Sequence, residues 1–355
     1  MQCAVRNLSK FIKTAFYKAE CNAQHGQQIR SLRTLRSTKR EDDELKELAD
    51  INRHSGEEQL PQNRSDVAID LTSPREAHVP TFNLAAHVNN SKTLQQFLSL
   101  GVSLHKIERR KGLGEFLLRL DFEQDVKSHL TFLVDQGVHP DSLGELVTKN
   151  PLIFKEDLDD LQTRVEYLKT KRFSDEARQR IITENPYWLM YSTRRIDRRL
   201  GYFQKEFGLS GDNLRFLATK EPRIITYSLE PIRKSLFCMR EEMGFNKSEL
   251  RELILKKPKL LMIPPDDLIE RFSYAHNEMG LSHASLLQWP ELLTSREFRL
   301  RERHEFLKLL GRAQYDPQKD LYISPGSIVQ GNNFYFVRHV AKSDIQTFDL
   351  FVKTR

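Results

Sequence analysis

Five prolines recur at a nearly constant spacing along the chain, and each opens the same short phrase. They lie 35, 36, 36 and 32 residues apart, with apolar residues at the second and third positions after each: Pro151, Pro186, Pro222, Pro258 and Pro290. A fixed period of about 20–50 residues indicates a repeat array. Such an array offers an extended binding surface, with no pocket built for small-molecule chemistry.

Apolar residues also occupy fixed positions after each proline. The column ten residues after the proline contains Leu161, Ile196, Ile232, Leu268 and Leu300. The columns at fourteen and seventeen residues are apolar as well, with His304 as the single exception. Offsets of ten, fourteen and seventeen form one stripe of an α-helix. Because proline ends a preceding helix, each repeat is predicted to be helix, short 3₁₀-like turn, helix.

Residues at the ends of these helices support the same division. Asp157, Ser192 and Ser228 are suitable N-caps for three of the second helices. The segment from Thr294 to Glu297 has the spacing of a capping box. We therefore expect the second helix of each repeat to begin about seven residues after its proline.

Glycines mark the junctions between repeats. Each of them ends a helical pattern and precedes an apolar residue: Gly101, Gly137, Gly208, Gly244 and Gly280. A glycine in this position commonly adopts the left-handed conformation that closes a helix. Arg172 occupies the missing position between Gly137 and Gly208, so the same backbone conformation is expected there.

The repeat pattern predicts an all-α superhelical solenoid, and the whole chain divides into four segments. Residues 91–310 hold about six repeats, the first of them degenerate, and residues 311–355 form divergent C-terminal capping helices. Residues 41–90 carry eleven acids and four bases with few large apolar side chains, which predicts an acidic disordered linker.

Residues 1–40 have the composition of a mitochondrial transit peptide. They contain nine lysines and arginines but one acid, and one helical face is apolar while the opposite face is basic. We expect cleavage between residues 36 and 45 and a location in the mitochondrial matrix. The alternative is a basic tail that binds nucleic acid directly. No apolar run is long enough to cross a bilayer, so membrane insertion is not expected.

The net charge of +7 does not by itself indicate nucleic-acid binding. Without the leader and the acidic linker, the repeat body has 43 bases and 37 acids, which is only mildly basic. The distribution of basic residues along the chain is more informative about nucleic-acid binding than the net charge. Thirteen residues after four of the five prolines the chain has Arg164, Arg199, Arg271 and Arg303, and the middle repeat has Ser235 there.

Stacked repeats are expected to align these guanidinium groups as a ladder that holds phosphates. Further bases on the same second helices extend the predicted site: Arg194, Arg195, Arg198, Arg233, Lys234 and Arg299. The alternative for each arginine is a stem packed over the apolar stripe and a head paired with a neighbouring carboxylate.

Enzymatic motifs are missing from the sequence. It has no Gly-rich phosphate loop, no His-Glu-x-x-His helix and no Gly-x-Ser-x-Gly turn. Cys3 and Cys21 lie in the leader, which leaves Cys238 as the one thiol of the mature chain and excludes a disulfide or a cysteine-based zinc site. We expect no enzymatic activity, no cofactor and no metal.

The recurring Pro-x-apolar-apolar phrase between two helices, behind a mitochondrial leader, resembles the mitochondrial transcription termination factor (mTERF) family. The degenerate first repeat and the Phe-rich tail are most similar to its third metazoan subfamily. The resemblance covers roughly residues 91–355. It implies a half-doughnut superhelix with a basic concave groove for double-stranded nucleic acid. It also implies regulation of mitochondrial transcription, or a role in ribosome assembly through ribosomal RNA.

The predicted function is therefore non-enzymatic binding of double-stranded mitochondrial DNA or structured RNA. Ribosomal or transcription-machinery proteins are further expected partners, and a monomer is the expected state. The alternative is a helical-repeat scaffold that binds proteins in the mitochondrial matrix. A third hypothesis is that the protein is a hydrolase, and this hypothesis predicts titratable groups that converge in a deep cleft.

Overall fold

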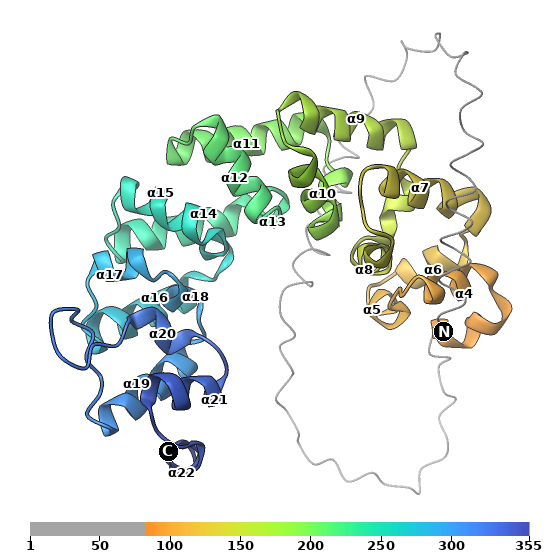
Figure 1. The fold of residues 1–355 in the computed structure, drawn as a ribbon. Helices are drawn as coiled ribbons and strands as arrows, with labels where there is room; N and C mark the ends of the chain where they lie inside the picture. Colours follow the sequence, from red (N-terminus) through yellow and green to blue (C-terminus); the bar gives the residue numbers. More distant parts are fainter. Residues whose placement is uncertain (1–82, 355) are drawn as a thin grey trace, which may run out of the picture. The chain divides into compact units, whose positions relative to one another are not determined.

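The computed structural model describes residues 83–354. The predicted transit peptide and nearly all of the predicted linker lie outside these residues. All regular secondary structure of the described residues is helical, and they contain no β-strand. The described chain forms two compact lobes, an N-terminal lobe of residues 83–192 and a C-terminal lobe of residues 193–354 (Figure 1).

The N-terminal lobe begins with short helices. These helices are α3 Leu84–His87, α4 Lys92–Ser99, α5 Leu104–Glu108, α6 Leu113–Leu118 and α7 Lys127–Asp135. A π-helical turn, Phe122–Val126, leads into α7. The first proline repeats follow as α8 Leu143–Lys149, α9 Leu158–Thr170 and α10 Asp175–Glu184. Their proline turns, Pro151–Lys155 and Pro186–Met190, are 3₁₀-helices, as the sequence predicts.

The C-terminal lobe continues the same pattern. Its first three repeats use α11 Thr193–Phe207, α12 Gly211–Lys220, α13 Arg223–Thr226, α14 Leu229–Phe237, α15 Lys247–Lys256 and α16 Pro265–Ser273. The remainder holds α17 His283–Gln288, α18 Glu291–Thr294, α19 Glu297–Leu309, α20 Pro325–Val329, α21 Asn333–Tyr335 and α22 Ile345–Lys353. The Pro258–Met262 turn is 3₁₀, whereas Pro222 and Pro290 each precede a single α-helical turn.

The columns predicted from the proline spacing form part of the core. Every residue of the column ten positions after each proline is at most 2% exposed. His304, the polar exception, is also buried, and its Nδ1 lies 2.5 Å from the hydroxyl of Tyr315. Burial lowers the pKa of His304 to about 4, so the imidazole is neutral at physiological pH. The all-α helical repeat fold is thus confirmed.

The junctions adopt the conformation that the sequence predicts. All five junction glycines have positive φ, from 59° at Gly208 to 91° at Gly137. Arg172 has φ 62°, so a non-glycine residue adopts the left-handed conformation at the equivalent position. The cost of this conformation for a residue with a Cβ is of order 1 kcal/mol.

Three details of the repeat ends differ from the prediction. Ser228 stands at the N-cap of α14, but its side chain makes no capping hydrogen bond. Glu297 does not close a capping box, because the residue at the N-cap of α19 is Arg296 and its side chain makes no capping hydrogen bond. A capping box forms instead between Asn246 and Glu249, at the start of α15. A further proline turn begins at Pro325, 35 residues after Pro290, inside the segment predicted to form divergent capping helices.

Candidate nucleic-acid interface

Three of the arginines in the predicted ladder are enclosed by protein contacts. Arg164 has a side chain that is 14% exposed; it pairs with Glu156 and donates to the carbonyl of Leu189. Arg271 is 13% exposed and donates to Asp267 Oδ2 at 3.1 Å. A guanidinium held this way is largely covered by protein and is already paired with a carboxylate.

Arg303 is completely buried in the C-terminal lobe. Its guanidinium donates to the carbonyls of Ile328, Gln330 and Gly331, at 2.7, 3.0 and 3.1 Å. A fourth bond reaches the side-chain oxygen of Asn333 at 2.9 Å. Burial lowers the pKa of Arg303 to about 10, which leaves it protonated at neutral pH.

These arginines share a target. Arg164 donates to Leu189, Arg271 to Leu293 at 3.4 Å and Arg303 to Ile328, and each acceptor lies three residues after the proline of the next repeat. Ser235, in the same column, also reaches forward and donates to the carbonyl of Ile263 at 2.7 Å. The column therefore connects successive repeats. This corrects the phosphate-binding role expected for Arg164, Arg271 and Arg303.

The other predicted bases divide by exposure. Arg194, Arg198, Arg233 and Lys234 are exposed, whereas Arg195, Arg199 and Arg299 are half-buried. Lys234 pairs with Glu230 at 3.0 Å, a surface ion pair of small energetic value. Arg199, the remaining member of the ladder column, has its Nη1 atom buried.

One face of α11 is strongly basic. Arg194, Arg198 and Lys205 follow the spacing i, i+4, i+11 and therefore lie on one side of the helix. The buried side of the helix is formed by Ile196, Leu200, Phe203 and Phe207. All three bases are exposed, and none of them forms an ion pair with any residue between 83 and 354.

Bases from the following repeat extend this face. The guanidinium of Arg233 lies 5.4 Å from the ring centre of Tyr202, a cation–π contact. Burial raises the pKa of the Tyr202 phenol, so it stays neutral and can donate a hydrogen bond. A surface recess of about 740 Å³ adjoins them, and Lys205, Arg240 and Lys247 contribute its positive charge.

We call the exposed bases Arg194, Arg198, Lys205, Arg233, Arg240 and Lys247 the α11 basic surface. Its recess contains one acid, Glu206, which pairs with Arg240 at 2.8 Å. Lys205, Arg240 and Lys247 were not among the predicted site residues. The helical spacing of Lys205 from Arg194 and Arg198 is visible in the sequence and could have identified Lys205 as part of the same face. Arg240 and Lys247 join the surface only through the packing of successive repeats.

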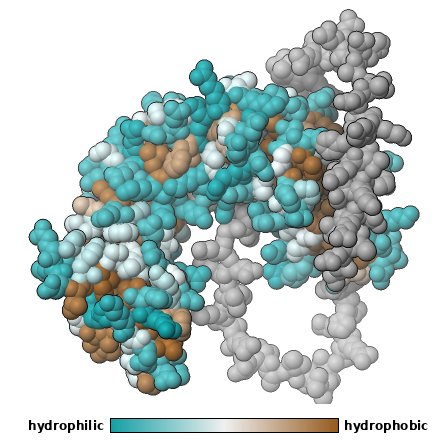
Figure 2. All heavy atoms as spheres, in the orientation of Figure 1, coloured by the Kyte–Doolittle hydropathy of each residue, from teal (hydrophilic) through white to brown (hydrophobic). Residues whose placement is uncertain are grey.

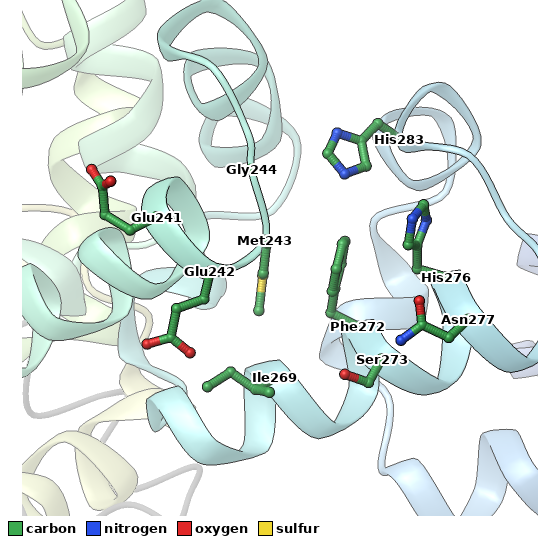
Figure 3. Close-up of a pocket in the computed structure, with 10 residues that line it drawn as sticks. All are labelled: Glu241, Glu242, Met243, Gly244, Ile269, Phe272, Ser273, His276, Asn277 and His283. Atoms are coloured by element: carbon green, nitrogen blue, oxygen red, sulfur yellow. The ribbon is translucent and has the colours of Figure 1, made fainter.

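A second recess of the C-terminal lobe has a different character. It measures about 380 Å³, and Figure 3 shows Glu241 and Glu242 on one side with Phe272, His276 and His283 on the other. The two imidazole rings are 5.4 Å apart, and His276 Nδ1 lies 2.7 Å from the carbonyl of Leu281. Among the described residues, no three or more His, Cys, Asp or Glu side chains are grouped so that they could hold a metal ion. The carboxylates of Glu241 and Glu242 make this recess unfavourable for phosphate.

Hydrophobic and hydrophilic side chains are unevenly spread over the face in view. Figure 2 shows hydrophilic spheres over much of α9 and α11, and hydrophobic spheres near the C-terminal end of the chain. In the C-terminal lobe, Leu309, Phe334 and Leu350 are 65%, 54% and 64% exposed. Among the helices between residues 83 and 354, none combines the length and hydropathy that a membrane span requires.

Comparison with known proteins agrees with this architecture. The sequence model of the mTERF family matches residues 86–317, which is more than half of the chain. "Transcription termination factor 3, mitochondrial" from Drosophila melanogaster is 68% identical over 99% of both chains. The protein of the same name from Mus musculus is 50% identical over 81% of this chain and 70% of its own, and that from Rattus norvegicus is 48% identical over the same shares. The chain therefore belongs to the mTERF family and, within it, to the third subfamily.

Proposed function

We propose that this protein regulates mitochondrial gene expression by binding nucleic acid, without catalysis, at the α11 basic surface. The relatives are named as mitochondrial transcription termination factors. Their name supports a role for this chain in transcription of mitochondrial DNA. Binding to structured ribosomal RNA during ribosome assembly uses the same phosphate chemistry and belongs to the same proposal.

The observation that carries the proposal is the group of unpaired bases on one face of α11. Arg194, Arg198 and Lys205 are fixed to a rigid helix and have no carboxylate partner among the described residues. Guanidinium groups bind phosphate through two parallel charge-assisted hydrogen bonds. Binding a phosphate chain therefore does not require these bases to break existing ion pairs.

Several features fit a regulator without enzymatic activity. The two recesses described above are open, and in the one with acid and imidazole groups no hydrogen bond joins Ser273 to His276 or His283. We propose that the protein acts in the mitochondrial matrix as a monomer, together with proteins of the transcription machinery or the ribosome.

A titration with duplex DNA and with structured RNA, each at several salt concentrations, tests the proposal. With four to six phosphate contacts, the slope of log affinity against log salt is expected to be about −4 to −5. Replacing Arg194, Arg198 and Lys205 together by alanine is expected to reduce the slope by about three.

A control variant removes the same charge elsewhere. Lys92, Lys106 and Lys111 are exposed bases of the N-terminal lobe, and their triple alanine variant has the same net charge as the α11 variant. It is expected to bind nearly as well as the native chain. Equal losses in both variants would refute the assignment of the site to α11.

The alternative function is a protein-binding scaffold, which the exposed apolar side chains of the C-terminal lobe favour. Leu309, Phe334 and Leu350 provide hydrophobic surface of the kind found in protein interfaces. A scaffold predicts no retention of either nucleic acid, or retention that does not depend on salt. The same titration therefore distinguishes the two functions.

A further inference from the structure

Gly201 lies in the middle of α11, on the same face as the exposed bases. It is three residues after Arg198 and four before Lys205, so it occupies the position between them on the helix surface. Glycine is unfavourable in a helix interior because it loses more backbone entropy on folding than any other residue. Its presence there requires a reason.

The fold itself does not supply that reason. Gly201 is not among the residues with positive φ, and a Cβ added to it would meet no heavy atom within 4 Å. Two other helical glycines are enclosed: a Cβ at Gly144 would lie 2.1 Å from the carbonyl oxygen of Leu100, and one at Gly326 would lie 2.3 Å from the ring of Trp289. Gly201 faces open space and is exposed.

We propose that Gly201 is a contact site for the sugar–phosphate backbone of a nucleic acid, which lies along α11 between Arg198 and Lys205. This proposal rests on the proposed function and specifies how the ligand sits on the surface. The missing side chain leaves the helix backbone uncovered, so that a phosphate strand can approach it closely. The flanking bases then reach the phosphates on either side.

The dimensions of the helix fit this arrangement. Arg194 and Lys205 are separated by eleven residues, which is about 16 Å along the helix axis. Gly201 divides the interval between Arg198 and Lys205 into about 4.5 and 6 Å. A side chain at this position would stand at the centre of the basic face and hold the strand away from the guanidinium and ammonium groups.

The test separates stability from binding, because the two respond in opposite directions. Gly201→Ala is expected to raise the melting temperature by about 2 °C, since alanine is the better helix former and meets no neighbour. The same variant is expected to bind a fluorescein-labelled DNA duplex, or a structured RNA in the parallel arm, about five-fold more weakly. Gly201→Gln is expected to bind more weakly still, because its side chain is longer.

Gly211→Ala is the matched control. Gly211 is also an exposed helical glycine without positive φ, at the first position of α12 and outside the basic surface. Its substitution is expected to leave the affinity for both probes unchanged. The comparison shows whether weaker binding follows from the position of Gly201 or from the loss of any surface glycine.

Two results would overturn the inference while the proposed function stands. In the first, Gly201→Ala is more stable and binds as well as the native chain, although the triple alanine variant of Arg194, Arg198 and Lys205 binds poorly. In the second, Gly201→Ala lowers the melting temperature, which would assign the glycine to the fold. If the triple variant itself binds like the native chain, the proposed interface fails and the inference fails with it.

Discussion

Removing the guanidinium of Arg303 is expected to destabilise the C-terminal lobe without a direct effect on nucleic-acid binding. The side chain is fully buried and donates to three carbonyls and to Asn333. Its guanidinium also lies 4.9 Å from the ring centre of Phe336. Arg303→Met keeps most of the apolar stem but removes all the donors.

The magnitude follows from the acceptors that lose their partner. The carbonyl of Ile328 faces Arg303 from α20, and those of Gln330 and Gly331 face it from the turn after α20. Only the carbonyl of Ile328 is buried, and leaving it unsatisfied costs about 1–3 kcal/mol. Gln330 and Gly331 are exposed residues, so water partly replaces the guanidinium there and each lost bond costs about 1 kcal/mol. We therefore expect the variant to lose about 3–5 kcal/mol in free energy of unfolding.

Urea unfolding of Arg303→Met measures this loss. Hydrogen exchange should locate it at residues 325–341, where the turn is no longer tied to α19. Affinity for a DNA duplex, measured where the variant remains folded, should equal that of the native chain, whereas Arg198→Ala should show weaker binding and unchanged stability. If Arg303→Met instead unfolds like the native chain but binds weakly, the guanidinium faces the nucleic acid and the inter-repeat role is refuted.

Three further predictions concern the fold. The pKa of His304 is about 4 in the folded chain, below the ordinary value of 6.5, so the unfolded chain takes up the proton first. The contribution of neutral His304 to the free energy of unfolding is therefore fully present above about pH 6.5 and is expected to fall by about 3 kcal/mol as the pH drops to 4. Urea titrations across this pH range should show the loss in the native chain, and His304→Asn should remove it. Arg172→Gly should raise the free energy of unfolding by about 0.5–1 kcal/mol in the same assay, because it relieves the φ of 62°; a loss would contradict the strain argument. Burial, with smaller effects from Glu242 and Asp266, raises the pKa of the Cys238 thiol to about 11. Iodoacetamide at pH 8 should therefore label Cys238 only after urea is added, as mass spectrometry of its peptide would show, and rapid labelling of the folded chain would contradict this burial.

The repeat core was predictable because it depends on local rules. Proline ends one helix, the apolar spacing of ten, fourteen and seventeen defines the stripe of the next, and a left-handed residue closes it. These constraints act within one repeat, so the residues that obey them are visible as columns. Even the substitution of Arg172 for a junction glycine preserved the backbone conformation.

The role of the arginine column was not predictable in the same way. A position at the edge of an apolar stripe allows a long side chain to extend into solvent or to reach across to the next repeat. The sequence shows the same periodicity in either case. Only the packed structure shows that Arg164, Arg271 and Arg303 reach the carbonyls of the following proline turn.

The sequence by itself determined that the chain forms helical repeats and which columns of residues enter their core, because both follow from the local geometry of one helix and one turn. Tertiary structure decided which bases are exposed, because exposure depends on what the neighbouring repeat places beside each side chain. It also brought Arg240 and Lys247 to the recess beside α11. The open space around Gly201 likewise exists only in the folded chain.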